Sequence, residues 1–370
     1  MKKSTNHNEL KNMASAIRVL SIDAIEKANS GHPGLPLGMA DVVTILFNNF
    51  LKFNPHKPKW FDRDRFILSA GHGSMLLYSL GYLTGYKDVT LSQLKSFRQL
   101  GSKAAGHPEY GLLSNIETTT GPLGQGLANA VGMAISEKFL NNKYGNSLVN
   151  HKTWALVGDG CLMEGISQEA ISIAGHLKLN KLIVIFDDNG ISIDGSTNLT
   201  SSDNQLKRFE ASNWNTISIN GHDYTQIESA MKKSLISSKP TLIACKTIIG
   251  FGSPNKSGKS SSHGSPLGEI ESIITKKSYG HNLRPFELPK KTLDLWKKTQ
   301  IEGIRNYKSW TRRVEKSKLK KKFLNQFKKI NYKRDTKASD FLKNIVKKKQ
   351  NEATRKSSQN CIEILSKKIN

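Results

Sequence analysis

Residues 153–190 decide the fold of this chain, and they read TWALVGDGCLMEGISQEAISIAGHLKLNKLIVIFDDNG. Two apolar runs, 153–157 and 181–186, have the length and composition of buried strands, and each ends in a glycine-containing polar loop. Between them, about residues 164–177, apolar side chains recur at helical spacing. Strand, helix and strand in this order predict a βαβ unit with two parallel strands.

The flanking sequence extends the same pattern in both directions. Further strands are expected at 65–69, 216–219 and 241–247, and helices at about 10–28, 38–50 and 126–140. Strands that alternate with helices predict an α/β fold, with a parallel sheet flanked by helices. Ligands of such sheets bind at the carboxyl ends of the strands, so the loops there form the candidate site.

Asp159 and Asn189 follow the two strands of the βαβ unit, so both are expected at the same edge of the sheet. A carboxylate, an amide oxygen and a backbone carbonyl such as that of Ile191 suit Mg²⁺, which completes its octahedron with phosphate oxygens and water. Gly158 and Gly160 leave space for a diphosphate. Gly-Asp-Gly alone is weak support, because an aspartate after a strand is more often a helix cap. The βαβ context favours the metal site.

The stretch Thr118–Gly126 is the second glycine-rich loop, and it precedes the helix expected at 126–140. Its backbone N–H groups and the helix N-terminus could face a phosphate or a ring. A plain glycine-rich turn is an equally good interpretation. The loop is not a P-loop, since no Gly-Lys-Ser/Thr follows it.

Four histidines, His32, His72, His107 and His263, lie in glycine- or proline-rich loops. Imidazoles there can hydrogen-bond a diphosphate or move a proton. Any single one is more often structural, but four in separate loops favour one shared site. Metal binding by these histidines is the lesser option. The other six are interpreted as ordinary residues: His7, His56, His151, His176, His222 and His281.

Composition excludes several classes of protein. The 370 residues are 37% apolar and carry a net charge of +26. No apolar run approaches the roughly 18–20 residues of a membrane span, and no apolar signal core follows Met1. Cys161, Cys245 and Cys361 are too few and too far apart for a disulfide framework or a cysteine zinc site. A cytoplasmic protein with reduced thiols and no membrane association is expected.

The positive charge is concentrated near the C-terminus. Residues 286–370 hold 26 Lys+Arg against 8 Asp+Glu, a net of +18, whereas residues 1–285 hold 30 against 22, a net of +8. Clusters at 316–322 and 347–349 could contact nucleic acid. They lack interleaved aromatic residues, so a solvated basic linker is favoured and a nucleic-acid partner is not expected.

Taken in order, these motifs closely resemble transketolase across residues 10–310, and again at 354–360. The matching stretches are Ser30–Gly34, Ser69–Met75, Gly106–Glu109, Glu117–Gly126, Gly158–Gly165, Asp187–Gly195, Gly250–Lys256 and His263–Gly268. The resemblance implies the thiamine-diphosphate-binding fold with a basic helical C-terminal extension. It also implies transfer of a two-carbon ketol unit from a ketose phosphate to an aldose phosphate in the pentose phosphate pathway. The related deoxyxylulose-phosphate synthases share the Gly-Asp-Gly region but not the sequences found here at Thr118–Gly126 and His263–Gly268, so they rank below transketolase.

The resemblance assigns roles to individual residues. Thiamine diphosphate is the implied cofactor, with Mg²⁺, Ca²⁺ or another divalent ion, and it supplies the carbanion chemistry. The implied metal ligands are Asp159, Asn189 and the Ile191 carbonyl, and the implied cofactor contacts are His72, Gly121, Pro122, Leu123, Gly160, Asn189 and His263. The implied catalytic residues are His32, His107 and His263. His32, His263 and Arg355 would contact substrate, Arg355 through its phosphate, and Glu164 would belong to a subunit contact.

Two departures from the family stand out. Ser260 replaces a histidine common in the family, so substrate contacts there are expected to be looser. The family has three domains, and its cofactor lies between the first domain of one subunit and the second domain of the other. This chain resembles a diphosphate-binding domain at 1–285, a lysine-rich interdomain linker at 286–352 and the first-helix stump of the pyrimidine-binding domain at 353–370.

Three hypotheses follow for the function of the chain. The first is the N-terminal part of a transketolase, working as a homodimer or with a C-terminal transketolase chain that supplies the glutamate which activates the cofactor. The second is a truncated, non-catalytic remnant. The third, ranked last, is a basic nucleic-acid-binding protein with a secondary role.

Overall fold

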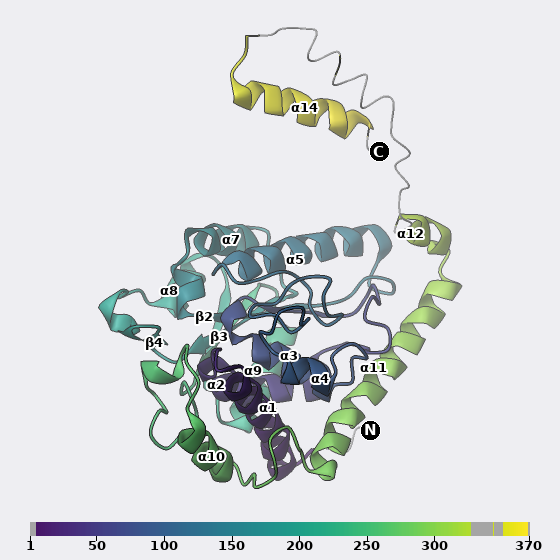
Figure 1. Ribbon diagram of the computed structural model, residues 1–370. Coiled ribbons are helices and arrows are strands. Elements are labelled where there is room, and N and C mark those ends of the chain that lie inside the picture. Colours follow the sequence, from purple (N-terminus) through teal and green to yellow (C-terminus); the bar gives the residue numbers. More distant parts are fainter. Residues whose placement is uncertain (1–4, 327–342, 344–350, 369–370) are drawn as a thin grey trace. The chain divides into compact units, whose positions relative to one another are not determined.

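The computed structural model describes residues 5–326, 343 and 351–368, and the chain divides into two compact units, Met1–Leu319 and Lys320–Asn370. Figure 1 shows the order of the elements along the chain. The candidate site residues of the βαβ unit all belong to the first unit, which is described first.

A five-stranded parallel sheet forms the centre of the first unit, in the order β1-β2-β3-β7-β6. The βαβ unit predicted from residues 153–190 is confirmed, because β2 (Thr153–Gly158) pairs in parallel with β3 (Leu182–Asp188) and α7 (Gly165–His176) lies between them in sequence. The pair Gly158 and Asp187 ends the β2–β3 register, so the loops after both strands begin side by side. The other three strands are also confirmed: β1 (Arg65–Leu68), β6 (Asn215–Asn220) and β7 (Thr241–Lys246).

Helices cover both faces of this sheet, as expected. Helix α5 (Gln125–Tyr144) lies against β1, β2 and β3 and contacts α7, while α2 (Gly34–Ile45) and α9 (Tyr224–Leu235) contact each other beside β3, β6 and β7. Figure 1 shows α5 and α7 above the sheet and α2 and α9 below it. The neighbouring strands β2 and β3 are buried along almost their whole length, as a sheet covered on both faces requires, whereas the edge strand β6 is more polar and partly exposed.

Helix α1 (His7–Ala28) is enclosed by other helices and not by the sheet. Asn6 and Glu9 form a capping box that starts it, three residues earlier than the apolar pattern indicates. It contacts α2, α3 (Ser74–Leu83), α4 (Leu91–Lys95) and α10 (Glu269–Ser278). Its C-terminal end delivers Ser30–Gly34 to the carboxyl edge of the sheet. The helix expected at 38–50 is α2, which begins earlier, at Gly34, and is followed by a π-helical turn, Leu46–Phe50.

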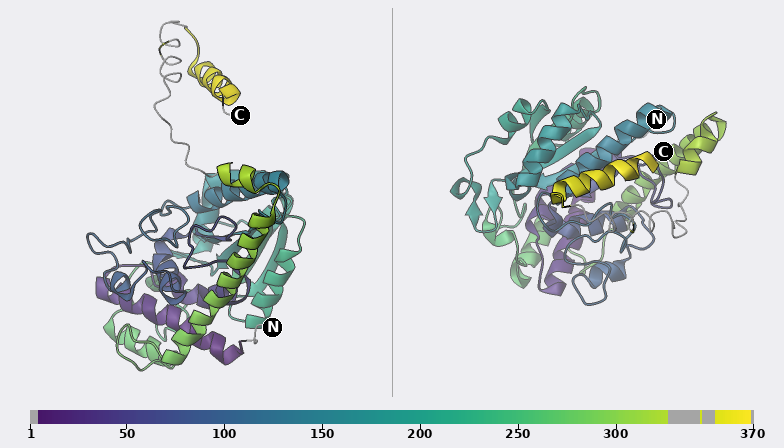
Figure 2. Two further views of the ribbon diagram at one scale, coloured as in Figure 1. Left: turned by 90° about the vertical axis from the view of Figure 1, so that its right-hand side faces the viewer. Right: turned by 90° about the horizontal axis from the view of Figure 1, so that it is seen from above.

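The sequence predicts a solvated linker from residue 286, but the structure has a packed helix in this part of the chain. Residues 290–316 form one long helix, α11 (Lys290–Lys316), which belongs to the first unit. Trp296 is fully buried and its Nε1 donates to the Met13 carbonyl at 3.1 Å, while the Trp310 Nε1 donates to the Leu148 carbonyl at 2.8 Å. Figure 2 shows this helix, in light green, running along the outside of the unit. Charge alone could not reveal the packing, because the lysines occupy the outer face of an amphipathic helix.

The second unit contains α12 (Lys320–Gln326) and α14 (Thr354–Lys368) among its described residues. The lysine cluster 347–349 lies outside the described residues. The first unit also contains shorter elements, namely 3₁₀ turns at Gly71–Gly73, Thr197–Leu199 and Ser260–Ser262, helices α6 (Asp159–Met163) and α8 (Gln205–Ala211), and strands β4 (Ile191–Ser192) and β5 (Gly195–Ser196). Over the described part of the chain, no helix has the length and apolar content needed to cross a membrane.

Candidate functional site

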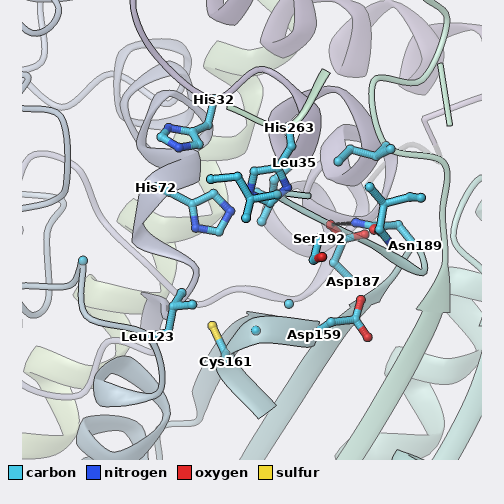
Figure 3. A pocket seen from close by; sticks show the side chains of 16 residues that line it. His32, Leu35, His72, Leu123, Asp159, Cys161, Asp187, Asn189, Ser192 and His263 are labelled. Atoms are coloured by element: carbon cyan, nitrogen blue, oxygen red, sulfur yellow. Dashed lines mark hydrogen bonds between the residues drawn. The ribbon is translucent and has the colours of Figure 1, made fainter. Parts of the chain in front are cut away.

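A pocket of about 370 Å³ opens at the carboxyl edge of β2 and β3. Loops and helix starts from widely separated parts of the sequence form its walls. Figure 3 shows three imidazoles on one side of the pocket and a group of side-chain oxygens on the other. The lining residues are His32, Leu35, His72, Gly121, Leu123, Gly158, Asp159, Gly160, Cys161, Asp187, Asn189, Ile191, Ser192, Ile193, Ile249 and His263.

The oxygen-rich wall comes from the loops after β2 and β3. Asp159 is the first residue of α6, directly after β2, and Asn189 follows β3. The Asn189 side-chain nitrogen donates to Asp187 Oδ2 at 2.9 Å, and its amide oxygen accepts from the Ile191 backbone N–H at 2.9 Å. These two bonds fix the orientation of the amide. The structure therefore brings Asp159, Asn189 and Ile191 to one pocket, as the sequence predicted.

Among the described residues, no lysine or arginine contributes to the pKa shifts of the Asp159 and Asp187 carboxyl groups. Burial, reinforced by Asp188 and Asp187, raises the pKa of Asp159 to about 7. Burial also raises the pKa of Asp187 to about 6, although hydrogen bonds from Thr247 and Asn189 oppose the shift. Asp159 Oδ2 is buried and has no hydrogen-bond partner in the part of the chain that the structure describes. An orphaned buried carboxylate oxygen close to other carboxylates is a suitable ligand for a divalent cation.

The candidate ligand atoms would make only part of the coordination shell of a metal ion. Within the described residues, no cluster of three or more histidine, cysteine or acidic side chains could hold a metal ion by itself. Asp159, the Asn189 amide and the Ile191 carbonyl are three oxygens, so a six-coordinate ion would need others from a ligand or from water. This set fits a cation that binds together with a diphosphate, and not a closed structural metal site.

Glycines keep the floor of the pocket open. A Cβ atom at Gly160 would lie 2.9 Å from Leu123 Cδ1, whereas a Cβ atom at Gly158 would meet nothing within 4 Å. Gly121 and Leu123 line the pocket and Pro122 between them is exposed. The loop and the Gly-Asp-Gly turn therefore approach each other closely without closing the space between them.

Three imidazoles form the opposite wall. The centroid of the His72 ring lies 5.1 Å from the His32 centroid and 5.1 Å from the His263 centroid. The His32 and His263 centroids are 5.9 Å apart. Burial lowers the pKa of all three, to about 4 for His32 and about 3 for His72. Arg98 adds to the effect at His32, and His263 adds to it at His72. All three rings are therefore neutral near pH 7.

Two predicted site residues of the first unit, His107 and Pro122, are not among the residues that line the pocket. His107 is exposed and packs beside Gly121, whose Cβ position is 3.3 Å from His107 Cγ; it contributes to the lowered pKa of His32 and His72. Arg355 is an exposed residue of α14, in the second unit. Glu164 is exposed between α6 and α7, and Ser260 starts the 3₁₀ turn just before His263.

Several lining residues were not predicted. Asp187 is fully buried in the site, and its only sequence signal is the doubled aspartate before Asn189. The apolar lining residues Leu35, Ile193 and Ile249 come from loops and a helix start, where periodicity gives no sign of a site. Cys161 also lines the pocket; its thiol is free and buried, and burial raises its pKa.

Comparison with known proteins matches the chain to one family. Residues 9–336 match the family model described as transketolase, thiamine diphosphate binding domain. The chain is 49% identical to transketolase 1 of Escherichia coli over 95% of its own length and 55% of that protein. It is 53% identical to a transketolase of Sinorhizobium medicae, over 85% of this chain and 45% of that protein.

Solved structures agree with these matches. A crystal structure of transketolase from Campylobacter jejuni superposes with a TM-score of 0.85 at 44% identity, covering 87% of this chain and 50% of that chain. Transketolase from Pichia stipitis in complex with sedoheptulose-7-phosphate superposes with a TM-score of 0.81 at 40% identity, covering 83% and 46%. The chain thus spans about half the length of the relatives it matches.

Proposed function

The chain belongs to the transketolase family, and from that premise we propose that it supplies the diphosphate-binding half of a two-carbon ketol transferase. One observation supports this function best. In one pocket, the carboxyl groups of Asp159 and Asp187, which have no cationic partner among the described residues, face three neutral imidazoles. One wall suits a cation and a diphosphate. The other suits the hydroxyl and carbonyl oxygens of a sugar phosphate.

We assign the oxygen wall to the cofactor thiamine diphosphate and its divalent cation. Asp159, Asn189 and the Ile191 carbonyl would hold the cation, for which Mg²⁺ and Ca²⁺ are the candidates. The glycine-lined floor, formed by Gly160 and the Gly121-Pro122-Leu123 turn, would lie along the diphosphate. Bound thiamine diphosphate supplies an electron sink for cleavage of the bond beside a ketose carbonyl.

The histidine wall would handle the substrate. Neutral imidazoles can donate from one nitrogen and accept at the other, so His32 and His263 would bind substrate hydroxyls and move protons at the reacting oxygen. His72 would hydrogen-bond the diphosphate. His107, exposed beside Gly121, would contact the substrate from the rim of the pocket.

Ketol transfer would also need the half of the relatives that this chain does not span. That half would come from the same polypeptide or from a separate C-terminal chain.

Exposed apolar side chains on α5 and α7, including Ile135, Phe139, Ile166 and Ile173, support a subunit contact there, with Glu164 at its edge. Arg355 would bind the substrate phosphate in that assembly. We place the reaction in the pentose phosphate pathway and in the cytoplasm.

Calorimetry with the chain, thiamine diphosphate and MgCl₂ tests the proposed function. We expect binding that requires both the diphosphate and the cation, so thiamine without phosphates should give no heat. Asp159→Asn should weaken binding at least tenfold, about 1.4 kcal/mol, because it removes the anionic ligand. The matched control is Asp203→Asn, which removes a carboxylate from an exposed ion pair with Arg208 and is not among the pocket-lining residues; it should bind normally.

Ketol transfer provides a second readout of the same experiment. The chain alone should be inactive, and activity should appear when the C-terminal half of Escherichia coli transketolase 1 is added. Binding that is equally strong without Mg²⁺, or unaffected by Asp159→Asn, would contradict the assigned site. Ketol transfer by the isolated chain would contradict the division of the activity between two halves.

A further inference from the structure

Arg98 contacts the ring of His32 on the side of Nδ1. Arg98 Nη2 lies 3.4 Å from His32 Nδ1, and Arg98 Nη1 donates to Ser30 Oγ at 2.7 Å. A guanidinium group has five N–H donors and no acceptor, so the imidazole nitrogen that it contacts must accept. A neutral imidazole that accepts at Nδ1 carries its proton on Nε2.

We propose that Arg98 is a positioning residue that holds His32 in the tautomer protonated on Nε2, which makes His32 a hydrogen-bond donor in the pocket. This inference rests on the proposed function only for the identity of the acceptor, an oxygen of the substrate or cofactor. The tautomer itself follows from the contact with Arg98.

The backbone of Arg98 has an unusual conformation at this contact. Its φ is +60°, in the left-handed region, which costs a non-glycine residue about 1 kcal/mol or more. The Arg98 N–H donates to the Ala104 carbonyl at 3.0 Å, which closes the loop that holds this conformation. A strained backbone at the residue that contacts a pocket histidine is expected where the side chain has a task.

The surroundings of the guanidinium restrict it further. The guanidinium carbon lies 5.6 Å from the centroid of the Phe97 ring, and the Arg98 Nε is buried with no hydrogen-bond partner in residues 5–326, 343 and 351–368. The Cβ position of Gly106 is 3.2 Å from Nε, so a larger residue there would displace the arginine. Among the described residues, no carboxylate forms an ion pair with Arg98. Its donors are therefore available to Ser30 and His32.

The charge of Arg98 acts in the same direction as its hydrogen bond. After burial, Arg98 is the largest contributor to the lowered pKa of His32. The arginine thus keeps the ring neutral as well as oriented. A neutral ring with a defined N–H can donate to a carbonyl or hydroxyl oxygen without adding a full positive charge to the pocket.

Nitrogen NMR of the chain labelled with ¹⁵N-histidine tests the proposal, because the ring nitrogen shifts and couplings distinguish the two tautomers. The signals of His32 are identified by their loss in His32→Gln. In the wild-type chain at pH 7 we expect the proton on Nε2. Arg98→Lys should retain that pattern, since lysine is also only a donor. Arg98→Glu should move the proton to Nδ1 or protonate both nitrogens, since a carboxylate accepts.

The control is Arg305→Glu, at an exposed position on α11, which should leave the His32 signals unchanged. A wild-type His32 that carries its proton on Nδ1 would overturn the proposal, whether or not any variant folds. An Arg98→Glu spectrum identical to that of the wild type would also overturn it. The NMR measurement needs no thiamine diphosphate. A failure of cofactor binding would therefore count against the proposed function without changing the result for the His32 tautomer.

Discussion

At the scale of single residues, close packing at Gly34 holds one wall of the pocket in place. A Cβ atom there would lie 2.5 Å from Ile249 Cγ1 and 2.8 Å from the Ser262 carbonyl oxygen. The Gly34 carbonyl also accepts from the Gly250 N–H at 3.2 Å. Ile249 and His263 line the pocket, so the start of α2 sets the position of the loop that bears both residues.

Gly34→Ala should therefore displace this loop. We expect it to destabilise the chain by about 1–3 kcal/mol, because the Ser262 backbone must move to admit the methyl group. Binding of thiamine diphosphate should weaken in parallel. Urea denaturation followed by circular dichroism measures the first effect and calorimetry the second.

The matched control is Gly132→Ala, on the exposed side of α5, where a Cβ atom would meet nothing within 4 Å. It should stabilise the chain by about 0.5–1 kcal/mol, because alanine favours the helix over glycine. A Gly34→Ala variant as stable as the wild type would show that the loop yields freely.

The sequence predicted one shared site for four histidines; three of them line the pocket and His107 does not, and the surroundings of the three were not predicted. His32, His72 and His263 were each placed in a loop, and the topology of a parallel sheet was enough to bring such loops together. Arg98 could not be predicted in the same way. Its role depends on a left-handed backbone and on a contact across 66 residues of sequence, and neither has a local signal.

At the scale of elements, a buried ionic cluster joins α1 and α2 to the loop after β6 and the loop after β7. Arg18 Nη2 lies 2.6 Å from Asp41 Oδ2, and Tyr224 donates to Asp41 Oδ1 at 2.7 Å. His222 Nδ1 lies 2.9 Å from Asp41 Oδ2, while its Nε2 accepts from the Ile248 N–H at 3.2 Å. His222, interpreted as ordinary from the sequence, thus connects Asp41 to the pocket loop.

The acid stability of the chain should depend on this cluster. Burial opposes ionisation of Asp41, but Arg18 and the hydrogen bonds of His222 and Tyr224 outweigh it and lower the pKa of Asp41 to about 2. Because this value is below the unfolded value near 3.9, the ionised carboxylate stabilises the fold above pH 4. That contribution, about 2 kcal/mol, is lost as the pH falls from 4 towards 2.

Urea denaturation between pH 7 and pH 2 checks this expectation. Asp41→Asn should be destabilised at pH 7 by about 3–5 kcal/mol, because Arg18 is left buried without its partner. The difference in unfolding free energy between wild type and variant should shrink below pH 4. Asp203→Asn, at an exposed ion pair, should change stability by under about 1 kcal/mol. A difference that is constant with pH would exclude Asp41 as the source.

At the scale of the whole chain, α11 shows where sequence-based prediction was weakest. The βαβ unit was predictable because buried parallel strands are uniformly apolar and have sharp glycine-rich ends. Residues 290–316 include nine lysines and arginines, and of their large apolar side chains only Leu295, Trp296, Trp310 and Val314 are buried. The surface that covers this narrow apolar stripe comes from residues about 160–280 positions earlier in the chain, so the local sequence does not show where the helix packs.

Truncation tests whether α11 completes the first unit. A chain ending at residue 319 should unfold at the same urea concentration as the full chain. A chain ending at residue 289 should lose more than about 3 kcal/mol, since it loses the buried Trp296 and Trp310 side chains. It should also bind a hydrophobic dye. Equal stability of the two truncated chains would support the boundary expected at residue 285.

The contact between Trp296 and Met13 also has a consequence for biosynthesis, since the two residues are 283 positions apart. Ribosomes add roughly 5–20 residues per second, so about 15–60 s separate synthesis of α1 from synthesis of the helix that helps to cover it. Helices α2, α3 and α4 can pack against α1 early in that interval, but the part of α1 around Met13 that contacts Trp296 stays uncovered until α11 is made. The core around Met13 is therefore completed only after translation has passed α11.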